Sequence, residues 1–113
     1  MKPFLVDVPV LILFFNRPQQ LSQVFEQVRN ARPSKLFLYQ DGPRSEHDLP
    51  GIKACREVTD QIDWDCEVHR MYQEKTRLAT FGIHFTKWAF SMVDKCIVLE
   101  DDDVPSVSFF HIL

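Results

Sequence analysis

The sequence predicts an α/β protein with a Rossmann-like, mostly parallel sheet flanked by helices, and two observations lead to this prediction. First, short apolar runs of strand length alternate with segments in which apolar residues recur at helical spacing. Second, the runs at 8–15 and 96–99 are continuously apolar, which is typical of strands buried on both faces. Strands that alternate with helices in this way form parallel sheets covered on both sides, so we expect the order β-α-β-α-β-α-β.

The first half of the chain contains two of the predicted strands and two of the predicted helices. The strand at 8–15 precedes a helix at 17–31, in which Pro18 suits the first turn and Pro33 ends the helix. A strand at 35–40 ends at the turn signal 41–43, and a helix at 49–62 follows. The apolar faces of the two helices consist of Leu21, Val24, Phe25 and Val28, and of Ile52, Cys55, Val58 and Ile62.

The second half continues the alternation less regularly. Residues 64–69 form a weak alternating strand, and residues 78–93 carry an apolar helical face. The buried strand at 96–99 runs directly into the acidic segment 100–103. We expect Pro105 to begin another helix, which includes Phe109 and Phe110.

Composition and charge limit the function classes. A chain of 113 residues with 45% hydrophobic residues is one globular domain at most, and its net charge of −3 without a basic block argues against binding nucleic acid or anionic membranes. The longest apolar run is too short to span a bilayer, and the first residues lack signal-peptide features. We therefore expect a cytoplasmic protein, with any membrane association made through other parts. Three separated cysteines predict buried, reduced thiols rather than disulfides.

Ligands of parallel sheets bind outside the carboxyl ends of the strands, so the segments 15–17, 40–42 and 100–103 are candidate site segments. Four consecutive acidic residues after a buried strand concentrate negative charge, which a divalent cation would neutralise. Mg²⁺ and Mn²⁺ prefer such oxygen ligands and are commonly held by one or two carboxylates plus substrate phosphates. The alternative is a solvated acidic turn. Two interpretations likewise remain for Arg17, Asp41, His84 and the basic segment 75–77. They could contact a phosphate or a base, or they could be ordinary solvated residues.

Several segments together resemble the N-terminal half of a GT-A glycosyltransferase, most closely the group similar to N-acetylglucosaminyltransferase I and to bacterial family 2-like transferases. They are 9–17 (PVLILFFNR), 36–44 (LFLYQDGPR), 88–90 (WAF), 97–102 (IVLEDD) and 105–110 (PSVSFF). The Leu-Glu-Asp-Asp piece with the following Pro-Ser and paired Phe is the most specific of these. The resemblance implies that the chain is the nucleotide-sugar-binding half of one GT-A domain, 1–113, without the acceptor half and its catalytic base.

The resemblance also implies residue roles. Arg17 and Asp41 match positions that hold the uridine of a UDP-sugar, and the acidic run matches the family's variant of the Asp-x-Asp (DXD) motif. Asp102 is then the ligand of Mn²⁺ or Mg²⁺ that bridges the diphosphate. The metal would stabilise the departing diphosphate while the sugar passes to a hydroxyl of a saccharide or lipid acceptor. The nucleotide-binding set is Phe15, Asn16, Arg17, Gln40, Asp41, Gly42, Lys75, Thr76, His84, Glu100 and Asp101.

One segment departs from the family pattern. Thr76 stands where related chains usually carry Asn, and the nearby glycines are largely absent from 75–82. This difference favours the alternative of a non-catalytic nucleotide-binding or interaction module. The other alternative is a nucleotidyltransferase, whose sheet and acidic strand end would look alike, but such an enzyme would usually have a Gly-rich basic loop after the first strand, which 16–20 is not. Because half of a GT-A sheet would expose an edge and an apolar face, we also predict self-association of the chain.

Overall fold

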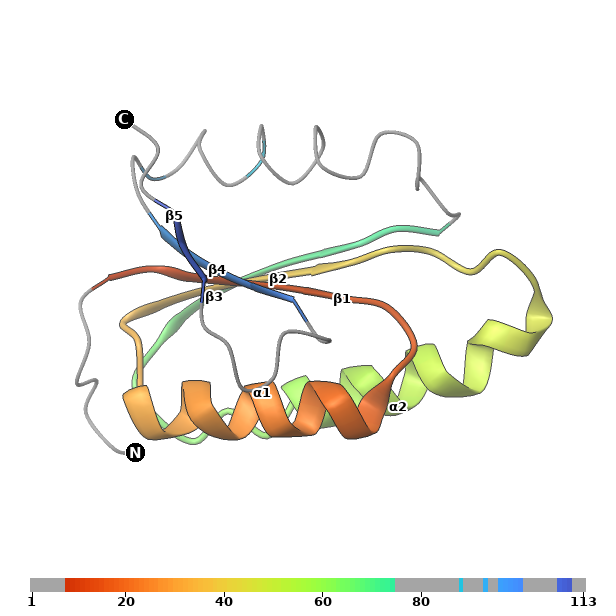
Figure 1. Ribbon diagram of the computed structural model, residues 1–113, viewed down its shortest axis with the longest axis horizontal. Helices are drawn as coiled ribbons and strands as arrows, with labels where there is room; N and C mark the ends of the chain where they lie inside the picture. Colours follow the sequence, from red (N-terminus) through yellow and green to blue (C-terminus); the bar gives the residue numbers. More distant parts are fainter. Residues whose placement is uncertain (1–7, 75–87, 89–92, 94–95, 101–107, 111–113) are drawn as a thin grey trace.

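The computed structural model describes residues 8–74, 88, 93, 96–100 and 108–110, which form a five-stranded sheet with two α-helices (Figure 1). The strand order is β3-β2-β1-β4-β5; the first four strands are parallel, and β5 pairs antiparallel to β4. The elements are β1 (Val10–Phe14), α1 (Pro18–Ala31), β2 (Lys35–Gln40), the 3₁₀ turn η1 (Glu46–Asp48), α2 (Leu49–Thr59), β3 (Glu67–Tyr72), β4 (Cys96–Glu100) and β5 (Ser108–Phe110). The predicted α/β, Rossmann-like class is confirmed.

The two central strands are buried on both faces, as their continuous apolar runs predict. Every residue of β1 is buried, and only the first residue of β2 is partly exposed. Because side chains alternate across a strand, these residues divide between two cores. The core under the helices contains Val10, Ile12, Phe14, Leu36 and Leu38, and the core on the other face contains Leu11, Leu13, Phe37 and Tyr39.

Helices α1 and α2 cover the same face of the sheet (Figure 1). The chain steps from β1 to β2 to β3 in one direction, and right-handed crossovers in one direction place their helices on one face. The chain then returns past β1 to β4. Trp88, between β3 and β4 in the sequence, packs against Phe37 and Tyr39 on the opposite face. The remainder of the predicted helix at 78–93, apart from Val93, lies outside the described residues.

Element boundaries differ from the prediction where polar contacts intervene. The third strand begins at Glu67 rather than at 64, because Trp64 turns into the helical core and its indole N–H donates to the Pro33 carbonyl at 2.9 Å. Helix α2 ends at Thr59 rather than at 62, where the Thr59 hydroxyl donates to the Arg56 carbonyl at 3.0 Å. Helix α1 ends as predicted before Pro33, through Arg32 in the left-handed region with φ 47°.

The prediction of a helix containing Phe109 and Phe110 is wrong. Ser108–Phe110 is a strand that pairs antiparallel with β4, with Cys96 opposite Phe110 and Val98 opposite Ser108. The outer backbone groups of β4 need partners, and aromatic residues such as this Phe pair are enriched in strands, whereas the helix was expected from Pro105 alone. The edge of β4 is therefore paired, and β3 is an edge strand of the sheet.

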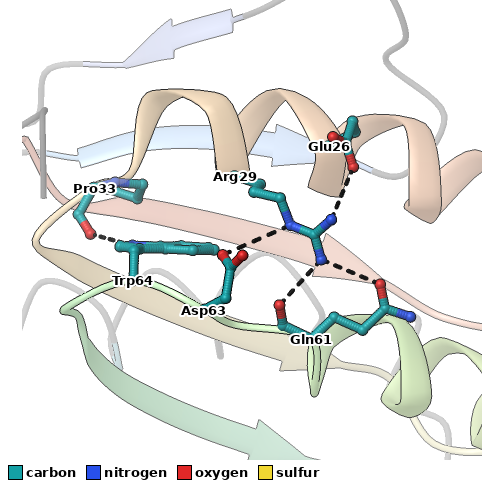
Figure 2. A network of polar contacts seen from close by, with 6 residues as sticks. All are labelled: Glu26, Arg29, Pro33, Gln61, Asp63 and Trp64. Atoms are coloured by element: carbon teal, nitrogen blue, oxygen red, sulfur yellow. Dashed lines mark hydrogen bonds and ion pairs between the residues drawn. The ribbon is translucent and has the colours of Figure 1, made fainter. Parts of the chain in front are cut away.

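A polar network at the amino end of the strands joins the two helices (Figure 2). The terminal nitrogens of Arg29 on α1 donate to the Glu26 carboxylate at 3.3 Å and to the Gln61 carbonyl at 3.1 Å, just beyond α2. Asp63 lies 3.8 Å from the Arg29 Nε, and Trp64 packs beside it against Phe25. These contacts join the end of α1 to the segment after α2, and the Trp64 bond to Pro33 joins that segment to the start of β2.

The cysteines are free thiols, as predicted, but only two of them are buried. Cys55 and Cys96 lie in the two cores, whereas Cys66 is half-buried. Burial raises the pKa of the Cys66 thiol to about 11. Within the described ranges, no helix has both the length and the apolar character needed to cross a membrane.

Candidate functional site

The predicted site segments that the structure describes meet at the carboxyl edge of the sheet. Strand β1 lies between β2 and β4, with Phe14 opposite Gln40 and Leu13 opposite Glu100. The ends of all three strands are therefore adjacent. The strand order reverses between β1 and β4, and such switch points are where ligands of open α/β sheets bind.

Gln40 is fully buried at the end of β2, and its side chain has three internal partners. Its amide nitrogen donates to the Phe15 carbonyl at 2.9 Å and to the Ile52 carbonyl at 3.1 Å. Its amide oxygen accepts from Arg56 Nε at 2.8 Å. Both amide hydrogens are thus used inside the protein, so Gln40 ties the loop after β1 to α2 instead of presenting donors to a ligand.

Asn16 bonds to a second buried polar group, the carboxylate of Asp48 at the start of α2. Asn16 Nδ2 donates to Asp48 Oδ1 at 2.8 Å, and the Arg44 backbone N–H donates to Asp48 Oδ2 at 2.9 Å. The Arg44 guanidinium also bonds to this carboxylate at 3.3 Å, which holds the pKa of Asp48 below its usual value and raises the pKa of Arg44. The same guanidinium lies 5.2 Å from the centre of the Phe15 ring.

Gly51 lets α2 approach the loop after β1 closely. A Cβ on Gly51 would lie 2.4 Å from the Asn16 carbonyl oxygen, well inside contact distance. The first turn of α2 therefore contacts the loop after β1 directly. Two hydrogen bonds hold this turn in place, one from Asn16 to Asp48 and one from Gln40 to the Ile52 carbonyl.

The other predicted residues differ in their access to solvent. Asp41 is buried, and its Oδ1 accepts from the Gly42 N–H at 2.9 Å, an arrangement that shapes the turn after β2. Arg17, the residue before α1, is exposed and forms no hydrogen bond or ion pair with its side chain to another described residue. Glu100 is exposed at the end of β4. Arg17, on the loop after β1, and Glu100, at the end of β4, thus lie on either side of the switch point, and both are exposed.

Several predicted residues lie outside the described residues: Lys75, Thr76, His84, Asp101 and Asp102. In the part of the chain that the structure describes, no three His, Cys, Asp or Glu residues gather as a metal centre would require. The described start of the acidic run, Glu100, nevertheless lies at the strand end where a metal-held diphosphate would be expected.

A groove that sequence reasoning missed lies between α2 and the end of β3, with a volume of about 600 Å³. It is lined by Pro43, Leu49, Ile52, Lys53, Arg56, Tyr72, Gln73 and Glu74. The Arg56 guanidinium lies 4.5 Å from the centre of the Tyr72 ring, on one wall of this groove. Helical spacing alone could have placed Ile52, Lys53 and Arg56 on neighbouring turns, but nothing in the sequence indicates that β3 continues to Tyr72.

Comparisons with known proteins support the fold and leave the function open. No protein-family model matches the chain, and no curated protein does. Among solved structures, a hypothetical protein from Sulfolobus tokodaii is similar, with a TM-score of 0.51 over 85% of this chain and 77% of that chain. Their sequences are 15% identical, so the likeness concerns the α/β fold alone.

Proposed function

We propose that this chain is the nucleotide-sugar-binding part of a metal-dependent glycosyltransferase of the GT-A type. The observation that carries the proposal is the switch point between β1 and β4, where an exposed arginine follows β1 and the acidic run begins at the end of β4. Arg17 supplies positive charge for a phosphate or a face for a base, and the acidic run supplies oxygen ligands for a metal. Together, these groups suit a nucleoside diphosphate bound with a metal.

In this proposal, different residues at this edge bind different parts of a UDP-sugar. Arg17 contacts the diphosphate or the uracil, and Asp41 at the end of β2 shapes the turn beside the nucleoside. Asp102 holds Mn²⁺ or Mg²⁺, which when bound neutralises the charge of the departing diphosphate. The acceptor hydroxyl and the carboxylate that deprotonates it belong to a part of the enzyme outside residues 1–113.

A second candidate is a non-catalytic interaction module with the same fold. The observation in its favour is that Asn16 and Gln40 both direct their polar groups to internal partners. These two residues then serve the packing of α2, and the site would retain only its charged loops. Such a module would not respond to nucleotide or metal.

An amide NMR titration of the chain with UDP, with and without Mg²⁺, tests the proposal. We expect metal-dependent shifts at Arg17, Asp41 and Glu100 that are lost in Asp102→Asn. Asp65→Asn, an exposed aspartate beyond the other end of α2, is the matched control and should retain the response. A folded chain whose spectrum ignores both UDP and Mg²⁺ would contradict the donor-site proposal and favour the interaction module.

A further inference from the structure

The groove between α2 and the end of β3 contains an arginine held in place from two sides. Arg56 Nε donates to the amide oxygen of the fully buried Gln40 at 2.8 Å, and the guanidinium lies 4.5 Å from the centre of the Tyr72 ring. Tyr72 is in turn fixed edge-on against Phe14, with ring centres 6.1 Å apart. The Gln40 amide cannot rotate freely, because its nitrogen donates to two backbone carbonyls.

This arrangement leaves the terminal nitrogens of Arg56 available. They form no hydrogen bond or ion pair with another described residue, whereas the Nε donates to Gln40 and the face of the guanidinium lies over the Tyr72 ring. A guanidinium already fixed in orientation loses little conformational entropy when it binds an anion, and its two terminal nitrogens match a carboxylate or phosphate. Arg56 therefore has the properties of a preorganised anion-binding group.

The other lining residues fit an anionic head with an apolar body. Lys53 lies one turn before Arg56 on α2 and brings a second cation to the same groove. Pro43, Ile52 and Leu49 form an apolar wall, and Leu49 is an unusually exposed large apolar residue at 49%. Small-molecule sites commonly combine apolar walls with a few placed polar groups in volumes of this size.

We propose that this groove binds a small organic anion, whose carboxylate or phosphate is held by Arg56 and Lys53 and whose apolar or aromatic body packs on Leu49 and Ile52. Glu74 lines the same groove and disfavours a second negative charge on the body of the ligand. The groove lies at the β2–β3 side of the sheet, whereas the proposed donor site lies between β1 and β4. The inference is therefore independent of the proposed glycosyltransferase function.

The test is an NMR titration of the chain with three probes: phenyl phosphate, benzoate and the neutral benzyl alcohol. The Arg56 Nε–H signal and the amides of Lys53, Gln73 and Glu74 report on the groove. We expect saturable shifts with phenyl phosphate or benzoate at millimolar concentration and none with benzyl alcohol. Which of the two anions binds more tightly distinguishes a phosphate site from a carboxylate site.

Variants distinguish the groove from general surface charge. Arg56→Met should weaken binding by about tenfold or more, since it removes the charge-assisted hydrogen bonds. Lys53→Met, at an exposed position that should not affect folding, should weaken it by a smaller factor. Arg70→Met, at an exposed arginine on β3, is the control and should leave binding unchanged. Equal binding of benzyl alcohol, non-saturating shifts, or full binding by both the Arg56 and Lys53 variants would overturn the proposal.

Discussion

At the amino edge of the sheet, Arg29 is enclosed by partners from the protein itself: Glu26 on its own helix and Gln61 and Asp63 beyond α2 (Figure 2). At the carboxyl edge, Arg56 is fixed just as firmly, but its terminal nitrogens have no partner among the described residues. Arg17 at the same edge is exposed. The two edges therefore use the same residue type differently, for stability at one end and for available positive charge at the other.

The direction of the parallel strands accounts for this difference. Every parallel strand ends at the carboxyl edge, so the loops that leave the sheet and the first turns of the helices collect there. At that edge Gln40 and Asp48 bond to the loop after β1 and so join it to α2. The side chain of Arg17 on the same loop is exposed to solvent. The comparison predicts that substitutions at the amino edge change stability alone, whereas those at the carboxyl edge also change ligand binding.

The largest expected effect is at the amino edge, in Trp64→Ala. The indole is buried between α1 and the sheet and donates to the Pro33 carbonyl, so its loss should destabilise the protein by about 3–5 kcal/mol in urea unfolding. Trp64→Phe keeps most of the packing and should lose about 1–3 kcal/mol, because the Pro33 carbonyl is left without its donor. The exposed neighbour in Asp65→Ala is the control. A loss below about 1 kcal/mol for Trp64→Ala would show that the amino edge does not hold the helical layer.

The second prediction concerns Gln40→Leu at the carboxyl edge. Leucine fills similar space but removes one hydrogen-bond donor from each of the Phe15 and Ile52 carbonyls, which should cost about 1–3 kcal/mol. The same change releases Arg56 Nε, so the Arg56 side-chain NMR signal should move toward that of a solvent-exposed arginine. The Trp64 variants should leave this signal in place. If Gln40→Leu lowers stability without moving it, Gln40 is only a packing residue.

The sequence predicted the first half of the fold well, because its elements follow strong patterns. The continuous apolar run of β1, the helical face of α1 and the residues of β2 lie where their spacing placed them. β3 is half-buried and begins three residues later than predicted, since Trp64 packs under α1 instead of joining the ladder. β5 was assigned to a helix because Pro105 resembles a helix start, and its pairing with β4 is not visible in the residue pattern of β5 itself.

The candidate site could be predicted only in outline. The rule that ligands bind at the carboxyl ends of strands placed Arg17, Asp41 and Glu100 at one edge, which the register of β1 with its neighbours confirms. The internal roles of Gln40 and Asn16 could not be predicted, because their partners are backbone carbonyls and a carboxylate 12 to 32 residues away. A polar residue after a strand has the same sequence pattern whether it faces a ligand or a helix.

Gly51→Ala should have a smaller effect than Gln40→Leu. Alanine normally stabilises a helical position by up to about 1 kcal/mol, but here its methyl group would meet the Asn16 carbonyl. Overpacking of this kind costs about 1–3 kcal/mol, so we expect a net loss of about 1–2 kcal/mol together with amide shifts at Asn16 and Arg17. Glu57→Ala, an exposed position on the same helix, is the control. Equal or greater stability of Gly51→Ala would mean that α2 can move away from the β1 loop without loss.

The smallest expected effect is the acid sensitivity that Asp48 confers on the carboxyl edge. Hydrogen bonds from the Arg44 side chain and backbone hold the pKa of Asp48 below its usual value. A lowered pKa means that the ionised carboxylate stabilises the fold fully above about pH 5, where the unfolded chain is also ionised, and that this contribution fades as pH falls through the folded value. Urea midpoints of the protein and of Asp48→Asn should therefore differ by a constant amount from neutral pH to about pH 5 and converge below about pH 4.

Because Arg44 is itself largely exposed, salt should reduce this difference at neutral pH, whereas it should leave the loss in Trp64→Ala unchanged. A difference that does not depend on pH would assign the role of Asp48 to its neutral hydrogen bonds, and the two edges would then be equally indifferent to acid.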